Sequence, residues 1–343
     1  MNHTLTTVPF GQTDMTITRA GFGAWAIGGG GWAFAWGDQD DADSVAAIRH
    51  AVESGINWVD TAAVYGLGHS EEVVGRALRD LPEADRPYVF TKGGLIWDES
   101  DRNKPAQRVG NPASLRREVE ASLRRLQVER IDLYQLHWPA EDGTPLEEYW
   151  QTFVDLRAEG KIRAAGLSNH GPAQLTAAER IGHVDSLQPR FSLIHRDHAK
   201  ETIPWCAAHG TGVIVYSPMA SGLLTGSFTA ERAAGLGDGD WRSRSPDFTG
   251  DGLRRNLALA DALRPVAERL GVSVGALAVA WTLAFPGVSG AIVGARRPEQ
   301  VDGWIAAGRL VLDDKDLTEI AAAVEATGAG EGSGPVRPPA ATA

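Results

Sequence analysis

The sequence predicts an α/β fold in which eight parallel strands and eight helices close into a (β/α)8 TIM barrel. Short β-rich apolar runs alternate with longer segments of helical period from about residue 56 onward. This alternation is typical of repeated βαβ units around a parallel sheet. The eightfold count favours a closed barrel, in which catalytic groups come from the carboxyl ends of the strands.

The predicted strands are short, apolar runs without strict alternation, as expected for strands buried on both faces. In chain order they cover residues 21–24, 57–60, 88–91, 131–136, 162–167, 186–188, 213–216 and 290–293. Proline lies near the first turn of several intervening helices, a position that favours it. These helices are predicted over residues 43–54, 71–81, 112–126, 145–159, 172–180, 203–209, 253–270 and 298–306.

Three segments fall outside the repeat, and none of them indicates a second domain. Residues 4–18 predict a β-hairpin, turning at 10–14, that plugs the amino-terminal end of the barrel. Residues 218–252 form a long loop after the seventh strand, and loops of that length are usually functional. We therefore expect one domain over residues 1–327, followed by a flexible tail, rich in Gly, Pro and Ala, over residues 328–343.

Composition limits the partners and the compartment. The formal charge is −11 with no lysine or arginine tract, which argues against nucleic acid as a partner. The single cysteine, Cys206, excludes an internal disulfide and favours a reducing compartment. Residues 1–11 show no leader pattern, and no apolar run reaches 18 residues. We expect a cytoplasmic protein that does not enter a membrane, and its oligomeric state stays open.

Ionisable residues follow three consecutive predicted strands. Asp60 and Tyr65 come after the second strand, Lys92 after the third and His137 after the fourth. Tyrosine loses its proton near pH 10, so a neighbouring cation such as Lys92 would lower its pKa and help it to donate a proton. Asp60 could hold that lysine charged, and His137 could bind the substrate oxygen or share the proton relay. Together these residues indicate acid–base chemistry on a carbonyl.

Several motifs, in order along residues 15–325, resemble the aldo-keto reductase superfamily. The similarity is to its bacterial group related to potassium-channel β subunits and general stress oxidoreductases. The motifs are Asp-Thr-Ala-Ala-Val-Tyr-Gly at 60–66, Ser-Glu-Glu at 70–72, Phe-Thr-Lys at 90–92, Leu-Tyr-Gln-Leu-His-Trp-Pro at 133–139, Gly-Leu-Ser-Asn at 166–169, Ser-Leu-Gln at 186–188, residues 216–226, and Ile-Val-Gly-Ala-Arg at 292–296 with Gln300.

The resemblance implies a catalytic tetrad of Asp60, Tyr65, Lys92 and His137, with Tyr65 as the proton donor in carbonyl reduction. It also implies a nicotinamide cofactor, bound without a Rossmann domain and with its ring stacked on Tyr216. The implied cofactor-binding residues are Ala24, Trp25, Asp60, Ser168, Asn169, Gln188, Tyr216, Ser217, Pro218, Met219, Ser221, Gly222, Leu224, Gly294, Arg296 and Gln300.

The resemblance favours NADPH, because Arg296 or Arg297 could pair with its 2′-phosphate. Gly303 and Trp304 stand where much of the family has Glu and Asn, so NADH stays possible. The glycine-rich and aromatic loop 25–37 suggests a mobile wall of the substrate pocket. The expected pocket residues are Trp25, Trp32, Tyr65, Trp97 and His137.

These observations favour an NADP(H)-dependent oxidoreductase that reduces an aldehyde, ketone or sugar-like carbonyl reversibly. One alternative is a nucleotide-binding regulatory subunit of the same fold with little turnover. Another is a metal-dependent barrel hydrolase or isomerase using Asp60, His137 and His195, but the ligand spacing for a metal is missing, so we expect none. We expect His195 to be a hydrogen-bonding residue of a loop.

Overall fold

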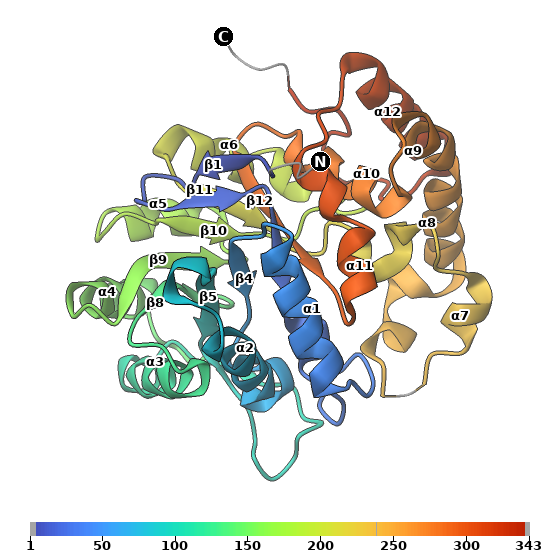
Figure 1. Ribbon diagram of the computed structural model, residues 1–343. Helices are drawn as coiled ribbons and strands as arrows, with labels where there is room; N and C mark the ends of the chain where they lie inside the picture. The colour runs from blue at the N-terminus through green and yellow to red at the C-terminus, as the bar shows by residue number, and fades with distance from the viewer. Residues whose placement is uncertain (1–4, 238, 340–343) are drawn as a thin grey trace.

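The computed structural model describes residues 5–237 and 239–339. Eight parallel strands form one closed barrel with a ring of helices outside it, which confirms the predicted fold class (Figure 1). The barrel strands are β3 (Ala20–Gly23), β4 (Trp58–Asp60), β5 (Tyr88–Gly93), β8 (Ile131–Leu136), β9 (Ile162–Ser168), β10 (Ser186–Gln188), β11 (Gly212–Val215) and β12 (Val288–Gly294). Strand β12 pairs with β3 and so closes the ring.

The helices follow the predicted positions, except that two predicted helices differ in extent and three observed helices were not predicted. They are α1 (Asp41–Glu53), α2 (His69–Arg79), α3 (Pro112–Leu126), α4 (Leu146–Ala158), α5 (Pro172–Glu179), α6 (Thr202–His209), α7 (Ala230–Ala234), α8 (Gly250–Ala262), α9 (Arg264–Leu270), α10 (Val274–Leu283), α11 (Pro298–Asp302) and α12 (Asp314–Thr327). The helix predicted over 253–270 is two helices, and Pro265 lies in the first turn of the second. The helix predicted over 298–306 stops at Asp302.

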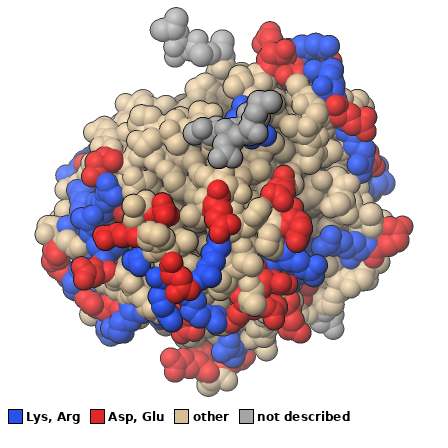
Figure 2. All heavy atoms as spheres, viewed as in Figure 1, with Lys and Arg blue, Asp and Glu red and all other residues tan. Residues whose placement is uncertain are grey.

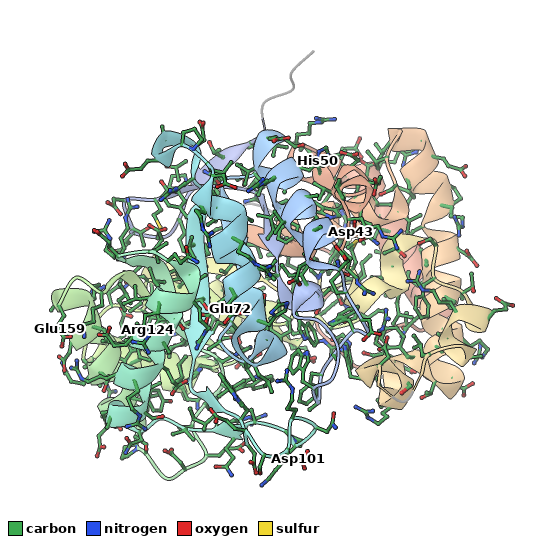
Figure 3. The ribbon with its side chains drawn as sticks, turned by 60° about the horizontal axis from the view of Figure 1, so that its bottom comes forward. Asp43, His50, Glu72, Asp101, Arg124 and Glu159 are labelled. Carbon is green, nitrogen blue, oxygen red and sulfur yellow. The ribbon has the colours of Figure 1, made fainter. Side chains whose placement is uncertain are left out.

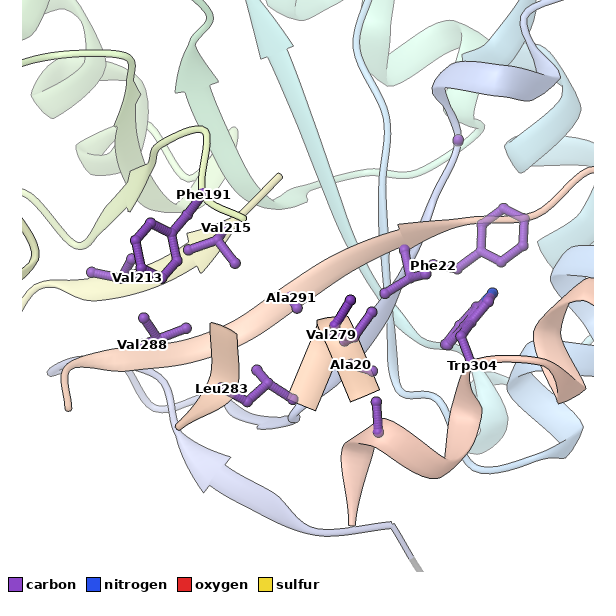
Figure 4. Packing of buried hydrophobic residues seen from close by; sticks show 14 of the residues in the cluster. Ala20, Phe22, Phe191, Val213, Val215, Val279, Leu283, Val288, Ala291 and Trp304 are labelled. Carbon is purple, nitrogen blue, oxygen red and sulfur yellow. The ribbon is translucent and has the colours of Figure 1, made fainter. Parts of the chain in front are cut away.

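Helices α7, α10 and α12 were absent from the predicted set. Every residue of α10 is buried, so its sequence shows no polar face and therefore no helical period. Figure 4 shows why: Val279 and Leu283 of α10 lie next to Ala291 and Val288 of β12, in the layer between barrel and helices.

A hairpin closes the amino-terminal end of the barrel, as the sequence predicts. Strands β1 (Thr7–Pro9) and β2 (Thr16–Thr18) are antiparallel, and residue 4 of the predicted hairpin lies outside the described residues. Phe10 inserts into the barrel and stacks on Phe90 with 5.7 Å between ring centroids. Trp58 fills the space beside Gly21, where a Cβ atom would lie 2.1 Å from the indole ring. The apolar floor leaves the opposite rim for polar chemistry.

The long loop after β11 is folded rather than irregular, and we call residues 217–249 the strap. It contains α7 and three 3-10 turns at Ala220–Thr225, Trp241–Arg244 and Pro246–Phe248. The strap reaches the loop after β3, where Trp36 and Asp240 form an isolated β-bridge. The predicted insertion 218–252 overlaps α8, which begins at Gly250.

The segment expected to be a flexible tail packs against the barrel along much of its length. Arg196, only 4% exposed, donates hydrogen bonds to the carbonyls of Gly330 and Gly334, each at 2.9 Å. The indole of Trp281 donates to the Val336 carbonyl at 3.0 Å. Buried donors that need acceptors therefore hold this segment in place. Residues 340–343 of the predicted tail lie outside the described residues.

The visible surface carries acidic and basic side chains side by side (Figure 2). Within the described ranges, no single helix is long and apolar enough to span a membrane. The segment of α8 and α9 is long and apolar enough for a membrane span only when α10 is added, and the two parts meet at a bend of 88°.

Candidate active site

The structure brings Asp60, Tyr65, Lys92 and His137 together at the carboxyl-terminal rim. Lys92 Nζ donates hydrogen bonds to Asp60 Oδ1 at 2.5 Å and to the Thr61 carbonyl at 2.8 Å. The same nitrogen lies 3.5 Å from the Tyr65 hydroxyl. The rings of Tyr65 and His137 meet edge to face with centroids 5.6 Å apart. Three strand ends thus deliver one compact cluster.

Asp60 and Lys92 form an ion pair almost sealed from water, with side chains 3% and 0% exposed. Burial lowers the pKa of Lys92, and the negative charge of Asp60 opposes that shift. Burial likewise raises the pKa of Asp60 against the effect of Lys92. Each group supplies the counter-charge that the other needs, so the pair stays ionised at neutral pH.

The pKa of Tyr65 is raised well above its ordinary value, first by burial and then by the charge of Asp60. The net shift is therefore opposite to the lowering that the sequence argument expected from Lys92. Because the lysine is already neutralised by Asp60, desolvation outweighs its attraction for a phenolate. Tyr65 consequently holds its proton across the neutral range.

His137 is neutral here. Burial lowers the pKa of its imidazole well below the usual range, and the charges of Lys92 and Arg108 lower it further. Its Nδ1 is buried and has no hydrogen-bond partner among residues 5–237 and 239–339. Of the two roles left open for His137, binding a substrate oxygen fits a neutral ring better than carrying a proton.

The turn that carries Tyr65 packs directly on the loop after β3. Gly66 has a φ of +62°, and a Cβ atom there would lie 2.0 Å from the carbonyl oxygen of Gly28. Ser70, at the start of α2, donates to the Ala24 carbonyl at 2.8 Å and lies 2.9 Å from the Thr61 hydroxyl. Glycine at 28 and 66 therefore allows the close backbone contact that positions the turn carrying Tyr65 against the loop after β3.

A cavity of about 360 Å³ extends from the cluster toward α11 between the barrel rim and the strap. It collects most of the residues expected to bind a cofactor. Those lining it are Ala24, Trp25, Asp60, Gln188, Tyr216, Ser217, Pro218, Met219, Ser221, Gly222, Gly294, Arg296 and Gln300. Three expected residues, Ser168, Asn169 and Leu224, do not line it.

Two of the expected cofactor-binding residues are engaged with protein groups. Asn169 donates to the His137 carbonyl at 3.0 Å and accepts from the Tyr216 hydroxyl at 2.9 Å. The side-chain amide of Gln188 donates to Asp60 Oδ2 at 2.9 Å. It also donates to the oxygen of Gln135 at 3.2 Å. Gln135, absent from the expected site, thus joins Gln188 in a buried network around Asp60.

The cavity has the features that a dinucleotide would need. Ser217, Ser221 and Gly222 have φ angles of 56°, 56° and 103°, the left-handed conformation that occurs in anion-binding turns. The indole nitrogens of Trp36 and Trp304 are buried without a partner in the described part of the chain, and both residues line the cavity. Unpaired buried donors are costly unless an acceptor arrives. The residues present therefore fit a phosphate-bearing ligand.

Arg296 is already held by the loop after β3. Its Nε donates to Gln39 Oε1 at 2.5 Å, and its Nη1 lies 3.4 Å from the Trp36 carbonyl. Its Nη2 donates to the Asp38 carbonyl. Arg297 is 70% exposed and lies 3.6 Å from Asp43. A 2′-phosphate would therefore compete with three acceptors for Arg296, which the sequence could not show.

Aromatic side chains form the wall above Tyr65. Trp25 stacks over Tyr65 at 6.1 Å and is covered in turn by Trp241 of the strap at 5.4 Å. Of the expected pocket residues, Trp25 and Tyr65 line the cavity, whereas Trp32, Trp97 and His137 do not. Trp32 is buried and donates to the Gly29 carbonyl at 3.1 Å. Asp101 lies at the outer end of the loop between β5 and α3, which carries Trp97 (Figure 3).

Sequence reasoning missed much of the strap's contribution. Arg242 is bound to Asp240 at 2.6 Å and lies 4.6 Å from the Trp36 ring centre. The motif at 216–226 identified residues in the first part of the strap, but beyond residue 226 the length of the insertion was the only signal. Further lining residues outside the expected set are Thr225, Ser227, Phe228, Arg232, Ser273, Gly275 and Ala295.

Among the residues that the structure describes, no group of three or more His, Cys, Asp or Glu side chains could hold a metal ion. His195 lies 2.9 Å from Asp247 and acts as a hydrogen-bonding loop residue, as the sequence predicts.

Comparison with known proteins identifies the family. The sequence profile of the aldo/keto reductase family matches residues 21–325. The chain is 36% identical over 330 residues to the NADH-specific methylglyoxal reductase of Escherichia coli, covering 93% of this chain and 99% of that protein. It is 35% identical over 317 residues to the aldo-keto reductase YhdN of Bacillus subtilis, covering 92% of each chain.

A solved structure, the glycerol dehydrogenase AKR11B4 from Gluconobacter oxydans, superposes with a TM-score of 0.84 at 38% identity and covers 98% of this chain and 99% of its own. Family profile, relatives and barrel architecture agree across nearly the whole sequence. The chain belongs to the aldo/keto reductase family.

Proposed function

We propose that this protein is a nicotinamide-dependent oxidoreductase that reduces a small aldehyde, ketone or sugar-like carbonyl to the alcohol, reversibly. The observation that carries the proposal is the sealed Asp60–Lys92 pair beside the protonated Tyr65 hydroxyl, at one end of a cavity suited to a dinucleotide. When bound, the reduced cofactor supplies a hydride.

The side chains of the cluster divide the remaining work. Tyr65 donates its proton to the carbonyl oxygen, since its pKa is raised and the phenol is intact at neutral pH. Lys92, held by Asp60, stabilises the negative charge that develops on the phenol oxygen 3.5 Å away. His137, neutral beside the Tyr65 ring, orients the substrate oxygen.

The cofactor occupies the cavity under the strap in this proposal. Backbone amides at 217–222 and the unpaired indoles of Trp36 and Trp304 meet its phosphates or adenosine. The sequence favours NADPH, but the Arg296 guanidinium already has three acceptors, and one relative is named for NADH. We therefore propose that NADPH and NADH differ in kcat/KM by no more than about tenfold, or 1.4 kcal/mol.

The substrate side favours a compact molecule. Trp25 and Tyr65 wall the end of the cavity, and relatives are named for methylglyoxal reduction and glycerol dehydrogenation. We propose short carbonyl compounds bearing a second oxygen as the class to test first. We further propose one reductase domain over residues 1–327 and a cytoplasmic location.

Turnover tests this proposal against the regulatory alternative. Purified protein is titrated with NADPH and NADH, then mixed with a panel of short aldehydes and ketones while absorbance of the reduced cofactor is followed. Tyr65→Phe should lose at least about 10²-fold in the rate of carbonyl reduction while keeping cofactor affinity, because only the proton-donating hydroxyl is removed. Binding without turnover in the unmodified protein would favour the regulatory function, and full activity of Tyr65→Phe would refute the role of Tyr65.

A further inference from the structure

A second ion pair, with one member fully buried, lies outside the barrel next to β5, the strand that carries Lys92. Glu71, in the first turn of α2, is completely buried, and its Oε2 accepts a hydrogen bond from Arg125 Nε of α3 at 2.7 Å. Figure 3 shows α2 and α3 side by side, with Glu72 and Arg124 on their outer surfaces. Glu71 and Arg125 are therefore the inward members of this helix pair.

Glu71 is linked to the catalytic strand through Thr91. Its Oε1 accepts a hydrogen bond from the Thr91 hydroxyl at 2.6 Å, and Thr91 is fully buried. Successive side chains of a strand point to opposite faces, so Thr91 faces the helices while Lys92 faces the barrel interior. The carboxylate thus grips β5 from outside at the residue next to Lys92.

The charges around Lys92 come from both sides of the barrel wall. Asp60, Tyr65 and His137 face it from the interior. Outside lie Glu71 of α2 with Arg125 and Glu118 of α3, whose Oε2 accepts from the Gly94 amide at 2.7 Å. Burial lowers the pKa of Lys92, and the negative charges of Asp60 and then Glu71 raise it.

The first turn of α2 also makes hydrogen bonds to the neighbouring barrel strands. Ser70 bonds to the ends of the two preceding strands, at Ala24 and near Thr61, while Glu71 holds the third. One helical turn therefore bonds to β5 and to the ends of β3 and β4, and β4 and β5 carry Asp60 and Lys92 of the cluster.

We propose that Glu71, with Arg125 as its counter-ion, is a positioning residue of the reaction that fixes the end of β5 and supports the positive charge of Lys92 through the barrel wall. This inference rests on the proposed function. This role differs from a purely structural one. A buried ion pair is weak evidence for a stabilising role, because proteins with apolar replacements of such a pair are often equally stable.

The test is the pH profile of kcat/KM for carbonyl reduction in Glu71→Gln, Arg125→Gln and the double variant. Activity needs charged Lys92 and protonated Tyr65, so it falls as pH rises through their pKa values. Glu71→Gln removes a negative charge and leaves Arg125 uncompensated, which should move this alkaline fall to lower pH by about one unit. Arg125→Gln should move it to higher pH, and the double variant should return it toward the parent.

Thr91→Val serves as the matched control, because it breaks the link to Glu71 but keeps both charges. It should lower kcat without moving the alkaline fall. Thermal melting of each variant identifies those that fold. If Glu71→Gln does not fold, the proposal is tested by whether the alkaline fall of Arg125→Gln moves to higher pH. An alkaline fall that stays at the parent pH in every folded variant would overturn the proposal. If Tyr65→Phe kept full activity, the proposed function itself would fail, so the two failures are distinguishable.

Discussion

At the residue scale, the decisive feature is a phenol that keeps its proton beside a lysine. Sequence reasoning placed Tyr65 and Lys92 together correctly, but it did not include the burial that raises the pKa of Tyr65. The sign of this shift depends on how completely Asp60 neutralises the lysine and how little water reaches the phenol. Both are properties of packing, and no motif encodes them.

The raised pKa of Tyr65 predicts opposite pH dependences for the two directions of reaction. Reduction uses the protonated phenol, which is fully populated below its pKa, and should lose nothing through Tyr65 until the pH passes 10. Alcohol oxidation uses the phenolate and should rise about tenfold per pH unit across pH 6–9. Steady-state kcat measured in both directions checks this, and an oxidation rate independent of pH would contradict it.

Gly66 predicts a second residue-level result. In Gly66→Ala the new methyl group would lie 2.0 Å from the Gly28 carbonyl oxygen, at a φ of +62° that side chains rarely adopt. We expect the free energy of unfolding to fall by more than about 2 kcal/mol. We also expect loss of reductase activity. Gly171→Ala is the control, since nothing lies within 4 Å of its Cβ position. Equal denaturation midpoints for the two variants would argue against the close contact.

At the element scale, the strap shows what a sequence can and cannot predict. Its length and position mark it as functional, and the structure places it over the cavity. The pairing of Trp36 with Asp240 joins segments more than 200 residues apart, so no local pattern indicates it. The same holds for Gln39 on Arg296. Helix α10 was missed for another reason, since complete burial removes the amphipathic signal.

Trp241 should control how fast the cofactor leaves. It stacks on Trp25 at 5.4 Å and meets Trp36 edge to face at 5.9 Å, so it ties the strap to the loop after β3. In Trp241→Ala we expect cofactor release to be about tenfold faster, with a smaller change in the chemical step. Stopped-flow fluorescence measures release, with Trp205→Ala on α6 as the matched control. Equal release rates in both variants would exclude this role.

At the scale of the whole molecule, the tail contributes to stability. Ending the chain after Thr327 removes the carbonyl partner of Trp281 and most of those of Arg196, whose guanidinium keeps the Leu193 carbonyl. Because lost hydrogen bonds to a buried charge are costly, we expect Tm to fall by about 5 °C or more. Arg337→Ala, which breaks an exposed ion pair with Asp314, should leave Tm nearly unchanged. Calorimetry compares the two, and equal Tm values would count against the tail contacts.

The global architecture was the most predictable level. Strand positions, barrel closure, the hairpin and the clustering of Asp60, Tyr65, Lys92 and His137 follow from periodicity and chain order. The charge state of each group and the partners of the cavity arginines depend on contacts between distant segments. Those contacts are fixed only when the barrel closes.

The hairpin that fills the floor of the barrel leaves the molecule closed at its amino-terminal end. With Phe10 against Phe90, the barrel axis offers no passage between the two ends. Ligands must therefore enter and leave at the rim. Because a ligand at the inner end of the cavity cannot leave past one bound nearer the rim, we expect ordered binding, with the inner ligand the first to bind and the last to dissociate.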